Sequence, residues 1–75
     1  MTARKSQRGL RGLKIGNRLR QERERARLSQ EELGRLAEVD NTNISRYETG
    51  SKLPNVETLG RLVRALKVEL GSLLR

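Results

Sequence analysis

Apolar residues recur at the spacing of an α-helix in three stretches outside the centre of the chain. The first stretch runs from about Leu13 to Arg27, and its inward face consists of Ile15, Leu19, Arg23 and Ala26. The second runs from Val56 to about Leu66, and its stripe consists of Val56, Leu59, Leu62, Val63 and Leu66. The third is a short segment that supplies Leu70, Leu73 and Leu74. Each stretch is predicted to be a helix, and Asn55 is the predicted N-cap of the second.

Two further helices, joined by a tight turn, are predicted between Ser29 and Gly50. Ser29 is a natural N-cap, and Glu32 three positions later completes a capping box. The apolar face of the helix that begins there consists of Leu33, Leu36 and Ala37. The following residues, 38–40, break this period.

The helix after this turn has two different faces. Asp40 is its predicted N-cap, and Gly50 stands where a glycine commonly follows a helix end. Its inward stripe consists of Ile44, Tyr47 and Glu48, whereas its outward residues are polar. These outward residues are Asn41, Thr42, Asn43, Ser45 and Arg46. A short helix with hydrogen-bond donors along its outer face suits the reading of base edges in a DNA major groove.

Arg23 and Glu48 are the charged members of two otherwise inward-facing stripes. An unpaired buried ion costs several kcal/mol, so we expect these two side chains to meet in a partly buried salt bridge. Such a pair would fix how the first helix meets the third. The alternative is that both charges are simply solvated. Gly16 lies inside the first helix, where a glycine destabilises the helix by about 0.5–1 kcal/mol relative to alanine. A close contact with another helix would explain why a glycine stands there.

Residues 1–12 have no apolar period. They include two glycines and no acidic residue, and their basic side chains are Arg4, Lys5, Arg8 and Arg11. We expect a flexible, disordered basic arm. Its functional interpretation is an arm that follows DNA phosphates or enters a minor groove. The alternative is a solvated tail.

The composition restricts the fold to one small domain with an aliphatic core. The chain has 75 residues, 33% of them hydrophobic, and Tyr47 is the only aromatic residue. Without cysteine, neither disulfides nor a thiolate metal site can stabilise it. These limits favour several short helices over a sheet. No internal repeat, no signal-peptide core and no apolar run near the ~20 residues of a membrane span is visible, so we expect a cytoplasmic protein.

The charge balance indicates a polyanionic partner. Seventeen Lys and Arg against nine Asp and Glu give a net charge of +8, more than solubility alone requires. Catalysis is disfavoured, because the chain has no histidine or cysteine to act as general base or thiol nucleophile. We expect no cofactor, metal or small-molecule ligand.

The stretch from Ser29 to Gly50 resembles the helix-turn-helix of the phage repressor and Cro family of DNA-binding proteins, also described as XRE-like or Cro/C1-type. The resemblance is carried by SQEEL at the opening, by Ile44, and by Glu48-Thr49-Gly50 followed by Pro54. It extends from about Leu13 to Leu74. The family implies an all-α, lambda-repressor-like bundle of five short helices over residues 13–75. It also implies a sequence-specific transcriptional regulator, either a repressor or a controller.

Within that family the second helix lies across the DNA backbone and the third enters the major groove. Carried over by position, the resemblance implies that Asn41, Thr42 and Arg46 read bases, with Asn43 and Ser45 flanking them. It implies a phosphate contact for Gln30, at the first turn of the second helix, where the helix dipole favours an anion. Ser51 and Lys52 are the other phosphate candidates. The resemblance also implies the pairing of Arg23 with Glu48.

The chain departs from the family pattern at the turn and before the last helix. Glu38 stands where glycine is usual, and a positive φ there would cost of order 1 kcal/mol. Gly34 replaces the usual alanine but still permits close packing of the third helix. Lys67 and Glu69 replace the residues that usually precede the fifth helix, so its start is open.

One recognition helix reads few base pairs, so we expect a homodimer on double-stranded DNA with half-sites about 34–36 Å apart. Leu70, Leu73 and Leu74 could form its two-fold interface, or they could close the core of the monomer. Two other functions remain open. One is an antitoxin or adaptor module that binds protein, and the other is a non-specific nucleic-acid binder.

Overall fold

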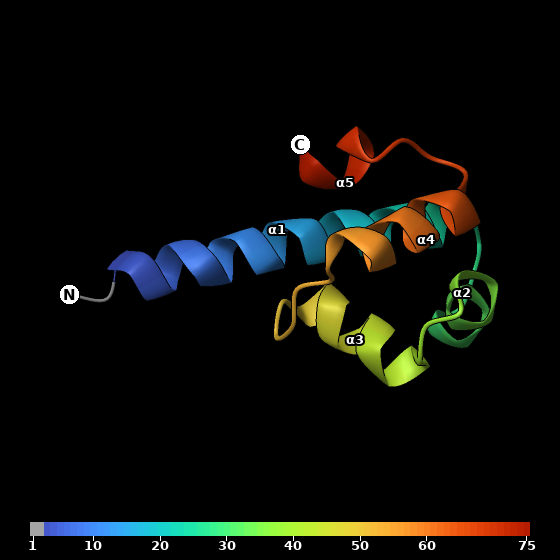
Figure 1. The fold of residues 1–75 in the computed structure, drawn as a ribbon, viewed down its shortest axis with the longest axis horizontal. Coiled ribbons are helices and arrows are strands. Elements are labelled where there is room, and N and C mark those ends of the chain that lie inside the picture. Colours follow the sequence, from blue (N-terminus) through green and yellow to red (C-terminus); the bar gives the residue numbers. More distant parts are fainter. Residues whose placement is uncertain (1–2) are drawn as a thin grey trace.

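The computed structural model describes the backbone of residues 3–75 and the side chains of residues 12–75. Five helices and no strand occur over residues 3–75 (Figure 1). They are α1 (Ala3–Arg25), α2 (Gln30–Ala37), α3 (Asn41–Thr49), α4 (Val56–Leu66) and α5 (Gly71–Leu74). The predicted all-α fold of five helices is confirmed.

α1 runs along the longest dimension of a molecule that measures 40 × 23 × 21 Å. α3 and α5 pack against α1, while α2 packs against α3 and α4. The N-terminal part of α1 extends beyond the other helices (Figure 1). This arrangement leaves one side of α3 without a covering helix.

The core is small and, apart from Tyr47, aliphatic, as the composition predicted. Every helix contributes to it, and its buried members are Leu19, Leu33, Ala37, Ile44, Tyr47, Leu59, Leu62, Leu66 and Leu73. Five of these side chains, one from each helix, are almost completely enclosed: Leu19, Leu33, Ile44, Leu62 and Leu73. Burial of one such side chain contributes about 1.5–3 kcal/mol, so the short helices depend on one another for stability.

The three central helices start where the capping residues predicted. Ser29 Oγ accepts a hydrogen bond from the Glu32 amide at 3.0 Å, and the Glu32 carboxylate accepts one from the Ser29 amide at 2.8 Å. Asp40 and Asn55 each accept one main-chain hydrogen bond at 2.8 Å. α3 ends at Gly50, which has a φ of 80° and is left-handed. Each of these caps satisfies main-chain groups that a helix end leaves without partners.

The start of α1 corrects the disordered arm expected over residues 1–12. The helix begins at Ala3, and residues 1 and 2 lie outside the described part of the chain. Gly12 was one of the two glycines in that expected arm, but a Cβ there would lie 2.9 Å from the Gly50 carbonyl oxygen. The glycine therefore marks a close contact between α1 and the end of α3, and the helix continues through it.

Three apolar residues that the periodicity placed inward are exposed. Leu36 is 60% exposed and Val56 is 80% exposed, and Ala26 is exposed just beyond the end of α1. On a helix of eight residues only a narrow stripe faces the core, and Leu33 and Ala37 of α2 occupy it. Val56 is the first residue of α4, at the edge of that helix's contact with the core.

Candidate nucleic-acid interface

α3 presents a polar surface on the side that no other helix covers. Ile44, Tyr47 and Glu48 are buried against the rest of the molecule. Asn41, Thr42 and Arg46 are exposed, and the flanking Asn43 and Ser45 are partly exposed. The structure therefore brings the five candidate base readers together on one short helix, with their side chains on the surface.

The position of α3 depends on close backbone contacts with its neighbours. A Cβ at Gly16 of α1 would lie 2.5 Å from the Glu48 carbonyl oxygen and closer still to that of Tyr47. The helix contact expected at Gly16 is therefore confirmed. A Cβ at Gly34 of α2 would lie 2.6 Å from the Val39 carbonyl oxygen, so the turn also packs tightly. Both glycines set how far α3 stands out from the body of the molecule.

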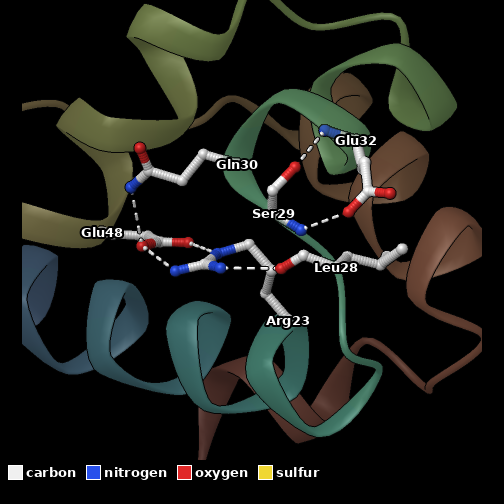
Figure 2. Close-up of polar contacts among 6 residues, drawn as sticks. All are labelled: Arg23, Leu28, Ser29, Gln30, Glu32 and Glu48. Carbon is white, nitrogen blue, oxygen red and sulfur yellow. Dashed lines mark hydrogen bonds and ion pairs between the residues drawn. The ribbon is translucent and has the colours of Figure 1, made fainter.

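An ion pair joins α1 to α3 beneath this surface. Arg23 Nε donates to Glu48 Oε2 at 2.6 Å, and Arg23 Nη2 donates to Glu48 Oε1 at 3.1 Å. The exposed fractions of the two side chains are 13% and 4%. Arg23 Nη1 also donates to the Leu28 carbonyl oxygen at 2.8 Å, so the guanidinium is held on two sides (Figure 2). The two charges that the sequence placed on inward stripes thus meet in a bidentate contact.

Hydrogen bonding to Glu48 raises the pKa of Arg23 above its usual value, and partial burial opposes this shift. Bidentate contacts between arginine and carboxylate are among the stronger ones and fix the relative orientation of their partners. The ion pair therefore helps to fix the orientation in which α3 packs against α1.

Gln30 has a role that the sequence did not indicate. Its Nε2 donates to Glu48 Oε1 at 3.0 Å, so the carboxylate accepts hydrogen bonds from both α1 and α2 (Figure 2). The sequence placed Gln30 on the surface as a phosphate candidate, and the structure finds it partly buried. A glutamine at a first helical turn gives no sign that it reaches a carboxylate 18 positions later.

The loop after α3 holds the two remaining phosphate candidates, Ser51 and Lys52, and both are exposed. Ser51 Oγ donates to the Arg46 carbonyl oxygen at 3.3 Å, which closes the end of the helix. Lys52 Nζ donates to Asn43 Oδ1 over a long 3.4 Å. The cation thus lies beside the polar face of α3, a contact that the sequence did not predict.

The turn between α2 and α3 is made by a left-handed glutamate. Glu38 has a φ of 58° and a ψ of 47°, the conformation that its place in the sequence raised as a possibility. Its amide bonds to the carbonyl oxygens of Arg35 and Gly34, which closes the end of α2. A residue with a side chain in this conformation carries a strain of about 1 kcal/mol.

Residues 14–75 match the helix-turn-helix domain family. The chain belongs to the helix-turn-helix domain family. Its structure is also similar to the crystal structure of the restriction-modification controller protein C.AhdI from Aeromonas hydrophila, with 32% sequence identity and a TM-score of 0.81. That similarity covers 83% of this chain and 94% of the other. A comparison with curated proteins gives no match.

In this helix-turn-helix protein, α2 and α3 form the motif, and Glu38 lies in its turn. The protein is a sequence-specific DNA-binding regulator of transcription. Helix-turn-helix regulators are typically not enzymes. The described residues hold no group of three or more metal-ligating side chains, and no helix over residues 3–75 is long and apolar enough to span a membrane.

Proposed function

We propose that this helix-turn-helix protein reads its operator through the exposed face of α3. Asn41, Thr42 and Arg46 are the base readers, and the exposure of all three opposite a fully buried stripe is the observation that carries the proposal. Asparagine can bond adenine at N6 and N7, arginine can bond guanine at O6 and N7, and the threonine methyl can contact thymine. Asn43 and Ser45 flank this set and reach a base or a phosphate.

Phosphate contacts at both ends of the motif would hold α3 in register. Gln30 stands at the first turn of α2, where free N–H groups and the helix dipole favour an anion. One amide hydrogen of Gln30 is used on Glu48, and its Nε2 carries a second that can reach a phosphate. Ser51 and Lys52 provide contacts beyond the other end of α3. Such contacts position the protein without reading sequence.

We further propose that the protein is a repressor or controller of a small operon or mobile element, located in the cytoplasm and without catalytic activity or cofactor. The similarity to a restriction-modification controller protein supports this class of regulator. The second candidate is a non-specific nucleic-acid binder, which the net charge of +8 favours.

A homodimer completes the proposal, because a single recognition helix contacts too few base pairs for useful specificity. Leu73 is buried and closes the core of the monomer, whereas Leu70 and Leu74 are 41% and 51% exposed on the same short segment. We propose that these two exposed leucines lie in the two-fold interface. Leu74→Asp should then shift light scattering from dimer to monomer. Leu53→Asp, a matched change at a leucine that is 45% exposed, should leave the dimer intact.

Selection from randomised DNA tests the proposed function. A dimer that reads bases should enrich a palindromic motif whose half-site centres lie about one helical turn, 34–36 Å, apart. Enrichment of a single half-site would retain base reading and refute the dimer. Binding without any enriched motif would instead support the non-specific binder. Failure to bind DNA at all would favour an antitoxin or adaptor module of the same fold.

A further inference from the structure

A hollow of about 380 Å³ lies between the end of α2 and the C-terminal half of α4. Its apolar lining consists of Leu36, Ala37 and Ala65. Ala37 is buried and Ala65 partly buried, while Leu36 beside them is 60% exposed. In Figure 1 the ribbons of α2 (green) and of the end of α4 (orange-red) lie next to each other, as their direct packing requires. The base-reading role of α3 uses none of these residues.

Basic side chains dominate the charged lining of this hollow. They are Arg61, Arg64 and Lys67, against the single acid Glu38. Arg61 is already engaged, because Nη2 pairs with Glu57 at 3.1 Å and Nη1 donates to the Glu38 carbonyl oxygen at 3.4 Å. Within residues 12–75, the side chains of Arg64 and Lys67 form no ion pair. Two exposed cations therefore stand beside an exposed leucine.

The hollow lies apart from the proposed DNA surface. No residue of α3 lines it. Gln30, the phosphate candidate of α2, lies six positions before Leu36, which corresponds to roughly 9 Å along a helix. A DNA backbone would use the cations but gain nothing from contact with Leu36 and the two alanines. A peptide with both carboxylates and a large apolar side chain would use both parts of the lining.

We propose that this hollow binds a short acidic segment of a partner protein. An apolar side chain of that segment covers Leu36 and Ala65, and its carboxylates pair with Arg64 and Lys67, away from Glu38. This interaction goes beyond the reading of DNA. It allows the regulator to hold a protein partner while α3 occupies a major groove.

Selection of short random peptides displayed on phage, with the full chain as the target, tests this proposal. The enriched peptides should combine acidic residues with at least one large apolar residue. Their affinity for the full chain should fall about tenfold or more with Leu36→Lys and also with Arg64→Glu. Because both side chains are exposed, circular dichroism should show that both variants remain folded.

Matched controls separate this site from the general charge of the protein. Leu53→Lys and Arg20→Glu alter an exposed leucine and an exposed arginine outside the hollow, and each should leave peptide affinity within about twofold. Operator DNA should not compete with the peptide. Competition by DNA would assign the hollow to the DNA surface and overturn the proposal. So would a lack of enriched acidic peptides, or peptide binding that persists in both Leu36→Lys and Arg64→Glu.

Discussion

Gly16 lies where α1 crosses α3, with no room for a side chain. A Cβ there would lie 2.5 Å from the Glu48 carbonyl oxygen, which is rigid backbone. Gly16→Ala should therefore lower the free energy of unfolding by about 1–3 kcal/mol. Gly60 of α4 has no atom within 4 Å of such a Cβ, so Gly60→Ala should raise it by about 0.5–1 kcal/mol. Urea unfolding measures the change in unfolding free energy for each variant. Changes of the same sign in the two variants would contradict the close contact at Gly16.

Arg23 and Glu48 form a pair in which each charge needs the other. In Arg23→Met the buried carboxylate would keep only the hydrogen bond from Gln30, so unfolding free energy should fall by about 3–5 kcal/mol. Replacing both partners, as Arg23→Met with Glu48→Leu, should restore most of that loss, because no buried charge then remains. Thermal unfolding of the wild type, of Arg23→Met and of the double variant measures these differences in stability. A single variant as stable as the wild type would show that the pair is solvated.

At the scale of single residues, the sequence predicted a contact where a charged residue stood among apolar ones on the inward face of a helix. Arg23 and Glu48 are charges on apolar stripes, and their contact could be inferred because burial requires a partner. The hydrogen bond from Gln30 could not be inferred, because a polar residue at a helix start is equally suited to the surface. Lys52 and Asn43 likewise meet only because the loop after Gly50 turns back along α3.

At the scale of helices, caps were more informative than periodicity. The starts of α2, α3 and α4 followed from Ser29, Asp40 and Asn55, whose side chains bond the first turn of each helix. Periodicity misplaced Leu36, because α2 with its eight residues offers too few positions to define a buried stripe, and it misplaced Val56, because that residue is the first of α4 and lies at the edge of the core. The sequence also failed to predict that α1 extends back to Ala3. Gly12 looked like a sign of local flexibility, whereas the structure explains it by close contact with Gly50.

The capping box of α2 should make stability depend on pH through Glu32. Hydrogen bonding with Ser29 lowers the pKa of this carboxyl from its usual 4.5. A lowered folded-state pKa stabilises the protein above 4.5, and this contribution disappears as pH falls through the folded-state value. The stability difference between wild type and Glu32→Ala should therefore be constant near neutrality and shrink below pH 4.5. Urea unfolding across this range measures it, and a difference independent of pH would contradict the box.

At the scale of the whole molecule, the charge of +8 should act mainly through phosphate contacts. Lys52→Ala should weaken binding to all DNA sequences alike and reduce the slope of log K against log salt by about one. Lys67→Ala removes an equal charge from the hollow between α2 and α4 and should leave this slope unchanged. Fluorescence anisotropy at several salt concentrations measures both. A base-specific loss in Lys52→Ala would show that this lysine reads sequence.

Base reading by the exposed face of α3 is tested most directly at Arg46. The measurement is the base preference of wild type and of Arg46→Ala, each obtained by selection from the same randomised DNA. We expect Arg46→Ala to lose about 1–3 kcal/mol of discrimination at one guanine in each half-site, with every other position of the motif preserved. An identical motif from the two proteins would contradict this role of α3.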